Sequence, residues 1–333
     1  MNKASVAKHI FAAALLALIL PMLATAQNEN NSPYRVSTDN GTIHIYPTPQ
    51  QSRQIKAQQG YVAPGVLSYH GGPIMTGESL YAIFWIPPTL QDGTATSLST
   101  KYQTVARQFL SDYPAHGITN NSTQYNQGSY YFKGTGQLTA YYVDTNPYPG
   151  SGCHDSVTGN NCITDAQLQT EIQRVMTLKG WTGGLNKMFI VFTSTGEGSC
   201  SDGTNSSCAY TQYCAYHGYF GLTGTPTIYA NQPYANPSYC YASSRGQKSP
   251  NADIPSDANV NVTSHEITEA NTDPELNAWW DTGNGEEIGD LCAWQFGTAS
   301  WDGGLANQMW NGHFYDLQLE YDNHTSSCVA VGP

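Results

Sequence analysis

Residues 264–290, SHEITEANTDPELNAWWDTGNGEEIGD, bring one imidazole and at least four carboxylates close together in the chain. Within this stretch His265, Glu266 and Glu269 form the motif H-E-x-x-E. On a helix, His265 and Glu269 would share one face a turn apart, with Glu266 about 100° around the axis. Zinc proteases use this layout, in which two side chains bind the metal and the intervening Glu is the base for a metal-bound water. The motif therefore predicts a metal site on a helix, with a carboxylate where the usual second His would stand.

Two acidic residues further along the chain extend this site. Glu287 lies 18 positions after Glu269, and Asp290 follows three positions later. Zinc proteases of this type often take a third ligand from a Glu roughly twenty residues beyond the helix motif, and a neighbouring Asp can orient a ligand His. We therefore predict that His265, Glu269 and Glu287 bind the metal. Glu266 is the predicted catalytic base, and Asp290 is an additional ligand or an orienting residue.

Four other side chains are candidates for the same region. His217, in C-A-Y-H-G, would add a nitrogen ligand, or it is a loop imidazole bonded to a backbone carbonyl. His70 lies in a glycine-rich turn and is either structural or substrate-facing. Trp279 and Trp280 would keep water out of the site and are candidates for substrate contact. Because carboxylates also suit harder ions, Ca²⁺ and Mn²⁺ are alternatives to Zn²⁺.

Three other interpretations of these residues are open from the sequence. H-E-x-x-E alone is a weak signal, since a solvated helix face often carries such residues. Paired carboxylates, either Glu266 with Glu269 or Glu287 with Asp290, would serve a glycosidase, although adjacent helix positions seldom supply both members. Finally, the carboxylates would bind Ca²⁺ or hold core hydrogen bonds in a non-catalytic protein whose Tyr- and Trp-rich loops contact polysaccharide.

The start of the chain predicts export. Lys3 and Lys8 precede an apolar run over residues 10–22, and A-T-A at residues 24–26 resembles a signal-peptidase site. Residues 1–26 are thus a predicted secretory signal peptide, which places the mature protein outside the cell or in the periplasm. No later segment stays apolar for long enough to suggest a membrane span.

The composition is that of an extracellular globular protein. Only 11% of residues are charged, and polarity comes from amides, hydroxyls and 23 tyrosines. Without Lys3 and Lys8, 11 basic residues stand against 25 acidic ones, a formal charge of −14. Such a chain is poorly suited to nucleic acid or an anionic membrane, but it tolerates metal ions. The sequence does not indicate an oligomeric state.

Eight cysteines follow the predicted signal peptide, and an even number in an exported chain indicates disulfides. A Cys-based zinc site would be expected to show a C-x-x-C pair, which the sequence lacks. Eight cysteines allow about 105 pairings, and local closure favours neighbours in the chain. The predicted pairs are Cys153 with Cys162, Cys200 with Cys208, Cys214 with Cys240, and Cys292 with Cys328.

Interleaved strand and helix patterns predict a single α/β or α+β domain over residues 63–333. It has a mixed sheet, a central zincin-like helix that carries H-E-x-x-E, and disulfide-stabilised loops. Residues 27–62 are a predicted N-terminal arm or pro-segment with one short strand at 42–46, and residues 199–250 are predicted to be mostly loops.

Apolar, β-branched runs predict strands at residues 79–86 and 187–193, and alternating tyrosines predict two antiparallel strands within 128–143. A first helix is predicted over residues 98–113. A second begins at a capping box of Thr164 and Gln167 and ends at Gly180. The third, which carries H-E-x-x-E, is predicted to be capped by Ser256 or Asp257 and to stop near Pro274.

Several motifs resemble those of the EXORDIUM, or phosphate-induced, proteins of plants. Y-H-G-G-P-I-M-T-G at residues 69–77 is similar to the family's Y-H-G-G-P-[IV]-x-T-G, and residues 214–217 resemble its C-G-x-H. HEITEANTDPELNAWW and EEIGDLC resemble its H-E-[IL]-x-E-x-x-T-[ND]-P-x-x-N-A-W and E-I-x-D-L-C. The similarity runs in order from about residue 65 to Cys292, and the chain departs from the pattern between Gly196 and Pro250 and in its tail.

The resemblance implies secretion to the cell-wall space and an association with growth responses, while the family's reaction is not settled. It also implies that the acidic residues after the helix and H-E-x-x-E belong to one family pattern, which favours a site over a solvated helix face. The export signal and composition suggest a microbial member. Together these observations favour a secreted zinc peptidase acting on peptide or cell-wall substrates, with the non-catalytic cell-wall protein as the alternative.

Overall fold

A computed structural model describes residues 32–333, apart from residues 60–64, 115, 151, 223–224 and 242–248. The predicted signal peptide, residues 1–26, lies outside the described residues. Within the described ranges, no helix combines the length and the apolar character that crossing a membrane requires.

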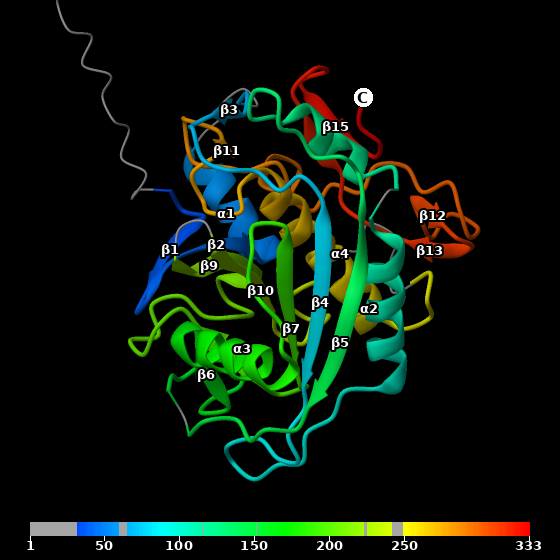
Figure 1. The fold of residues 1–333 in the computed structure, drawn as a ribbon. Helices are drawn as coiled ribbons and strands as arrows, with labels where there is room; N and C mark the ends of the chain where they lie inside the picture. The colour runs from blue at the N-terminus through cyan, green and yellow to red at the C-terminus, as the bar shows by residue number, and fades with distance from the viewer. Residues whose placement is uncertain (1–31, 60–64, 115, 151, 223–224, 242–248) are drawn as a thin grey trace, which may run out of the picture.

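A seven-stranded mixed sheet forms the centre of the molecule (Figure 1). Its first four strands are antiparallel neighbours, and the last four run parallel to one another. In spatial order the strands are β1 (Arg35–Thr38), β2 (Gly41–Pro47), β9 (Tyr213–Leu222), β10 (Thr225–Gln232), β7 (Lys187–Thr193), β4 (Glu78–Trp85) and β5 (Gly136–Asp144). The sequence predicted β4 and β7 to within a residue at each end, and the mixed α/β architecture is confirmed.

Helices cover both faces of this sheet, because alternate residues of each buried strand enter two different cores. Ile83 and Val191 pack with α3 (Asp165–Lys179) on one face. Phe84 and Ile190 pack with α2 (Thr100–Asp112) and α4 (Ile254–Thr272) on the other. The smaller helices are α1 (Pro49–Gln59), η2 (Thr119–Gln124) and η3 (Asp290–Cys292). Eight short strands form four two-stranded ribbons. These are β3 (Ser68–Tyr69) with β11 (Trp279–Trp280), β6 (Cys162–Thr164) with β8 (Gly198–Cys200), β12 (Gln308–Trp310) with β13 (His313–Tyr315), and β14 (Glu320–Asp322) with β15 (Ser327–Val329).

Helix α4 is buried along nearly its whole length, from Ser256 to Thr272. A helix that is buried on all sides is normally apolar all round. Much of α4, by contrast, is Asn, Thr, Ser, His and Glu. Its side chains must therefore find polar partners inside the protein, and those partners form the site described below.

The structure corrects the predicted start of this helix. Asp253, not Ser256 or Asp257, is the N-cap: its side chain accepts a hydrogen bond from the Ser256 backbone N–H at 3.1 Å. Pro255 occupies the first turn, where its missing N–H costs nothing. The helix ends at Thr272, just before Pro274, as predicted.

Two strand predictions were wrong. The stretch 128–143 contributes one strand, β5, which runs parallel to β4; Gly128 and Gly134 have φ of 62° and 60° and break the extended backbone before it. Its alternating tyrosines reflect an edge strand with a half-exposed face. The stretch 199–250, predicted to be mostly loops, supplies β9 and β10. These strands contain many Tyr, His, Gly and Thr residues, so a search for apolar runs does not detect them.

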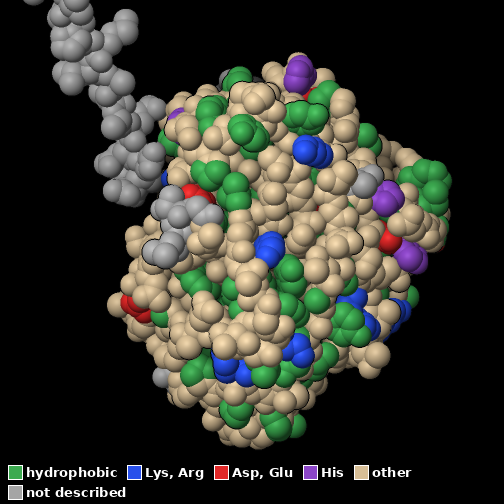
Figure 2. Space-filling view, viewed as in Figure 1, with side chains coloured by type: hydrophobic (Ala, Val, Ile, Leu, Met, Phe, Trp, Pro, Cys, Tyr) green, Lys and Arg blue, Asp and Glu red, His purple; other side chains and the backbone are tan. Residues whose placement is uncertain are grey.

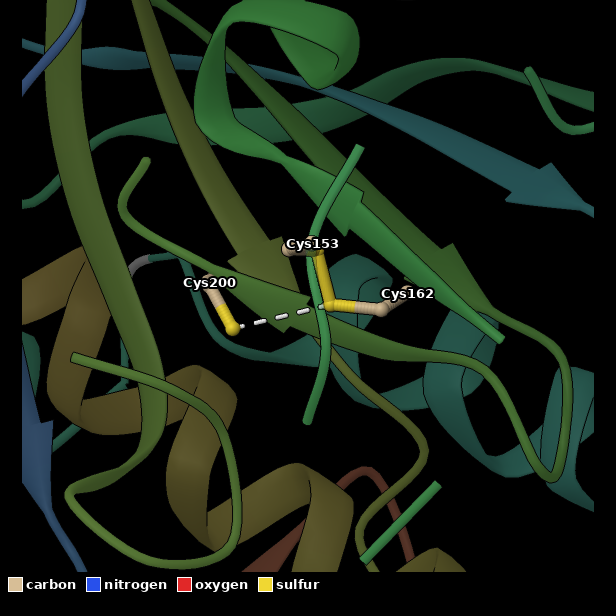
Figure 3. A group of neighbouring side chains, drawn as sticks. All are labelled: Cys153, Cys162 and Cys200. Carbon is tan, nitrogen blue, oxygen red and sulfur yellow. Dashed lines mark hydrogen bonds between the residues drawn. A yellow bond between two sulfur atoms is a disulfide. The ribbon is translucent and has the colours of Figure 1, made fainter. Parts of the chain in front are cut away.

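All four predicted disulfide pairs are confirmed: Cys153–Cys162, Cys200–Cys208, Cys214–Cys240 and Cys292–Cys328. Figure 3 shows Cys200 pointing toward the Cys153–Cys162 bridge, with the sulfur atoms of Cys162 and Cys200 3.5 Å apart. Although these sulfurs are close enough to suggest a metal site, every cysteine of the chain is bonded to another. The cluster therefore offers no thiolate ligand.

The capping box of α3 gives a direct test of how the sequence specifies this helix. The Thr164 hydroxyl accepts from the Gln167 backbone N–H, and Gln167 Oε1 accepts from the Thr164 backbone N–H. We expect Thr164→Ala to lower the free energy of unfolding by about 1 kcal/mol, because one N–H of the first turn loses its acceptor. Urea unfolding measures the loss. Thr164→Ser should restore most of it, and Thr170→Ala, at an exposed position of the same helix, should have a smaller effect.

Candidate functional site

Two histidines face each other across neighbouring strands beneath α4. His44 of β2 and His217 of β9 are directly opposed in the antiparallel register, and their ring centroids are 5.5 Å apart. In β2, Ile43 and Ile45 enter the core on the α3 side of the sheet, so His44 and Tyr46 face α4. The sequence prediction of His217 as a loop residue is corrected, because this imidazole lies within a central strand and is fully buried.

Helix α4 places the H-E-x-x-E residues against these two imidazoles. His265 and Glu269 are one turn apart, with Nε2 and Oε1 separated by 3.0 Å. Glu269 Oε2 lies 3.6 Å from His217 Nδ1 and 3.9 Å from His44 Nε2. Glu266 Oε2 lies 3.1 Å from His217 Nδ1. The helix thus directs all three of its motif side chains into one buried cluster.

The segment after β11 closes the cluster from the other side. Glu287 Oε1 lies 3.0 Å from His44 Nδ1, and Asp290 Oδ2 lies 2.7 Å from His44 Nε2. The Glu287 backbone N–H donates to Asp290 Oδ2 at 3.0 Å, which fixes the two carboxylates relative to each other. Between them, Gly289 approaches α4 so closely that a Cβ atom would stand 2.5 Å from His265 Nδ1. Glycine in E-I-G-D is therefore required by packing.

The last part of the chain adds two residues. Gln318 Nε2 lies 3.0 Å from His265 Nδ1, and its Oε1 accepts a hydrogen bond from the Tyr46 hydroxyl at 2.6 Å. Tyr46 also stacks on the His265 ring, with 3.7 Å between centroids. Glu320, on β14, adds a fifth carboxylate near the cluster and is fully buried. These contacts hold the His265 ring in one orientation.

We call this group the buried His–carboxylate cluster. All of its members have 0% of their surface exposed. They are His44, His217, His265, Glu266, Glu269, Glu287, Asp290 and Glu320.

The electrostatics of the cluster are unfavourable for a protein without a bound cation. Burial raises the pKa of all five carboxyl groups well above their ordinary values. Burial also lowers the pKa of the three imidazoles well below the usual value, so they are neutral bases. The charge of Arg35 acts on Glu287, but its guanidinium lies 3.5 Å from another buried carboxylate, that of Asp273. The charge of Lys56 acts on Asp290. The five carboxyl groups of the cluster therefore outnumber these two cations.

Several donor atoms in the cluster have no hydrogen-bond partner among the described residues. They include Nε2 of His217 and His265, both carboxylate oxygens of Glu269 and of Glu287, and Oδ1 of Asp290. Buried polar atoms are nearly always satisfied, so such a concentration indicates a ligand. Two sets of three side chains place their donor atoms within 4.8 Å of one another: His44, Glu269 and Asp290, and His217, Glu269 and Glu287. Imidazole and carboxylate together suit Zn²⁺ or Mn²⁺.

The predicted substrate-facing residues lie beside the cluster, not in it. His70 stacks on Trp280 with 3.6 Å between ring centroids, and Trp279 packs against Tyr69. The Arg35 guanidinium lies 5.1 Å from the Trp280 ring centroid. Arg35 thus links the aromatic ribbon of β3 and β11 to Asp273, the C-cap of α4.

The same arginine is part of the lining of a surface groove of about 450 Å³. Its lining includes Arg35 and Thr42 from the first hairpin, Tyr219 from β9, and Glu275 and Asn277 from the turn after α4. Thr42 and Tyr219 are two positions along their strands from His44 and His217, respectively, so they lie on the same face of the sheet. The groove therefore lies next to the cluster along β2 and β9.

The sequence analysis missed His44 and Glu320. A signal was present in both cases, because T-I-H-I-Y at residues 42–46 and L-Q-L-E-Y at 317–321 alternate polar and apolar residues. Such alternation places His44 with Tyr46, and Glu320 with Gln318, on one face of a strand. What the sequence did not reveal is that both polar faces point inward.

Comparison with known proteins finds one informative relative. A stretch of 84 residues is 38% identical to Protein EXORDIUM-like 3 of Arabidopsis thaliana. Over this stretch the chain is similar to an EXORDIUM-like plant protein. The match covers 24% of this chain and 24% of that protein, so it spans about a quarter of the relative's length. No family profile and no solved structure matches the chain.

Proposed function

We propose that this protein is an extracellular metal-dependent hydrolase and that it cleaves peptide bonds. The observation that carries the proposal is the convergence of three neutral imidazoles and five carboxylates, all fully buried, around unpartnered donor atoms. The four disulfides are compatible with an oxidising compartment outside the cytoplasm.

In this proposal His265, Glu269 and Glu287 bind the metal, as the sequence predicts, and His44, His217 and Asp290 complete its surroundings. Additional imidazoles make the site softer than one His with carboxylates, and therefore favour Zn²⁺ over Ca²⁺. The metal would act as a Lewis acid toward the scissile carbonyl. Glu266 would accept a proton from the attacking water and pass it to the leaving amine.

A substrate would approach through the groove that Arg35 helps to line. Arg35 is both a lining residue of that groove and close enough to the cluster to lower the pKa of Glu287 in part, against the larger effect of burial. An extended peptide in the groove would lie along β2 and β9, toward the histidine pair. Trp280, which stacks on His70, would hold the Arg35 guanidinium in place, so neither His70 nor Trp280 needs to contact the substrate.

Complete burial of the cluster favours a second candidate function. A structural metal site is closed by protein ligands, whereas a catalytic site keeps one position open. If the cluster holds a structural metal, the protein is a non-catalytic extracellular or cell-wall protein, and its exposed tyrosines, such as Tyr130, Tyr131 and Tyr141, are available to contact polysaccharide.

Glu266→Gln distinguishes the two functions. We expect this variant to keep its bound metal and to lose at least about 100-fold in the cleavage of a peptide library, because it lacks the proton acceptor. Cleavage is read by mass spectrometry and metal content by elemental analysis. The matched control is Glu197→Gln, which replaces a buried glutamate outside the cluster and should leave both quantities unchanged. Undiminished cleavage by Glu266→Gln, or no cleavage by the metal-loaded native protein, would favour the non-catalytic function.

A further inference from the structure

We infer that the cluster binds two divalent metal ions, bridged by Glu269. This inference deepens the proposed function and rests on it, since both require a metal at the cluster. It follows from the fact that the donor atoms divide into two sets. One set is His44, Asp290 and Glu269, the other is His217, Glu287 and Glu269, and in each set the donor atoms lie within 4.8 Å of one another.

Glu269 is the common member of both sets, and its position suits a bridging carboxylate. Its Oε2 lies between the two opposed imidazoles, 3.9 Å from His44 Nε2 and 3.6 Å from His217 Nδ1. Neither oxygen of Glu269 has a hydrogen-bond partner among the described residues, although the side chain is fully buried. A buried carboxylate with a hydrogen bond to neither oxygen is expected to have ligands on both.

The sheet register sets the spacing of the two sites. His44 and His217 are directly opposed across β2 and β9, and their ring centroids are 5.5 Å apart. Hydrolytic two-metal centres hold their ions about 3.5 to 4 Å apart. Because the Glu269 carboxylate lies between the two opposed rings, one ion at each ring would share that carboxylate.

Other residues of the cluster contact each of the two donor sets. His265 Nε2 lies 3.0 Å from Glu269 Oε1 and 3.8 Å from Asp290 Oδ1, so His265 would be a further ligand of the ion in the His44 half. Glu266 Oε2 lies 3.1 Å from His217 Nδ1, and His217 Nε2 lies 3.9 Å from Glu287 Oε2. A carboxylate on one nitrogen of a ligand His orients the ring and raises its basicity.

Metal stoichiometry tests the inference without any measure of activity. The exported native protein is loaded with Zn²⁺ or Mn²⁺, desalted, and examined by elemental analysis and native mass spectrometry. We expect about two ions per chain for the native protein and about one for His44→Gln or His217→Gln, since each removes one terminal imidazole. His313→Gln, which changes a partly exposed histidine paired with Asp112 outside the cluster, should still bind two.

The Mn²⁺-loaded protein provides a second readout, because two bridged Mn²⁺ ions are magnetically coupled. We expect the electron paramagnetic resonance spectrum of a coupled pair in the native protein and that of an isolated ion in His44→Gln and His217→Gln. If either histidine variant fails to give the native near-ultraviolet circular dichroism spectrum, Asp290→Asn and Glu287→Gln test the same two halves.

The possible outcomes separate the inference from the proposed function. One ion per native chain, whether or not the histidine variants keep it, would overturn the two-metal centre and leave a one-metal hydrolase intact. Two ions without magnetic coupling would contradict a Glu269 bridge. No binding of either metal would overturn both the inference and the proposed function.

Discussion

Removal of bound metal should lower the free energy of unfolding by at least about 4 kcal/mol, the stabilisation that one ligand gives at a thousand times its dissociation constant. The cause is the buried His–carboxylate cluster. Without cations, Glu269 and Glu287 would be left with four carboxylate oxygens that accept no hydrogen bond from any described residue in a fully buried site. The carboxyls must then retain protons or become solvated, and both outcomes favour the unfolded chain.

Urea unfolding of the native protein before chelation, after chelation and after reloading with Zn²⁺ measures this effect. Glu269→Gln is the informative control, because a variant that binds no metal should be insensitive to the chelator. Glu197→Gln should respond to chelation as the native protein does, since Glu197 lies outside the cluster near Gln91. Equal stability of the native protein with and without chelator would show that the cluster is held by shared protons alone.

The parts of this fold that could be predicted from the sequence are those specified by local interactions. The capping box at Thr164, the glycine that ends α3 in the left-handed conformation, and the apolar runs of β4 and β7 each involve a few neighbouring residues. The four disulfides follow the same rule, because each closes with the next cysteine along the chain. Local signals of this kind can be recognised in the sequence without knowledge of the tertiary structure.

The two histidines that face α4 depend instead on long-range pairing. His44 and His217 are brought together by the register of β2 on β9, which joins residues far apart in the sequence. Register is fixed by which faces of the strands are buried, and a polar strand face that is buried has the same pattern as one that is solvated. For this reason His44 was assigned to an arm or pro-segment and His217 to a loop.

The same limitation applies to charge. From composition, 25 acidic residues suggest an acidic surface. In the structure most of these residues are buried, and the face shown in Figure 2 carries few acidic side chains. Composition gives the number of charges but not their positions. The acidic residues from which the sequence predicted a tolerance of metal ions lie mainly in the interior of the protein.

Glu78→Gln should stabilise the protein on the alkaline side and have little effect in mild acid. Glu78 begins β4 and is 3% exposed; burial raises its pKa to about 8, although the Asn271 side-chain amide donates to its Oε1. The folded protein therefore keeps a proton on Glu78 that the unfolded chain releases near its ordinary pKa of 4.5. Since the folded state binds more protons between these two values, the free energy of unfolding falls as pH rises from 4.5 to about 8.

An amide at this position retains the hydrogen bond from Asn271 and cannot lose a proton, so the variant lacks this decline. Comparing urea unfolding at about pH 5 and about pH 8.5, we expect the advantage of Glu78→Gln over the native protein to grow by on the order of 3 kcal/mol. The neighbouring Tyr113 does not interfere, because burial raises its pKa well above 10 and it stays neutral throughout. Asp302→Asn is the control: it removes an exposed carboxylate at a position of positive φ, which Asn tolerates, and should leave the pH dependence unchanged. If the native protein and Glu78→Gln show parallel pH profiles, Glu78 is ionised in the folded state, and the polar interior around α4 must solvate an additional buried charge.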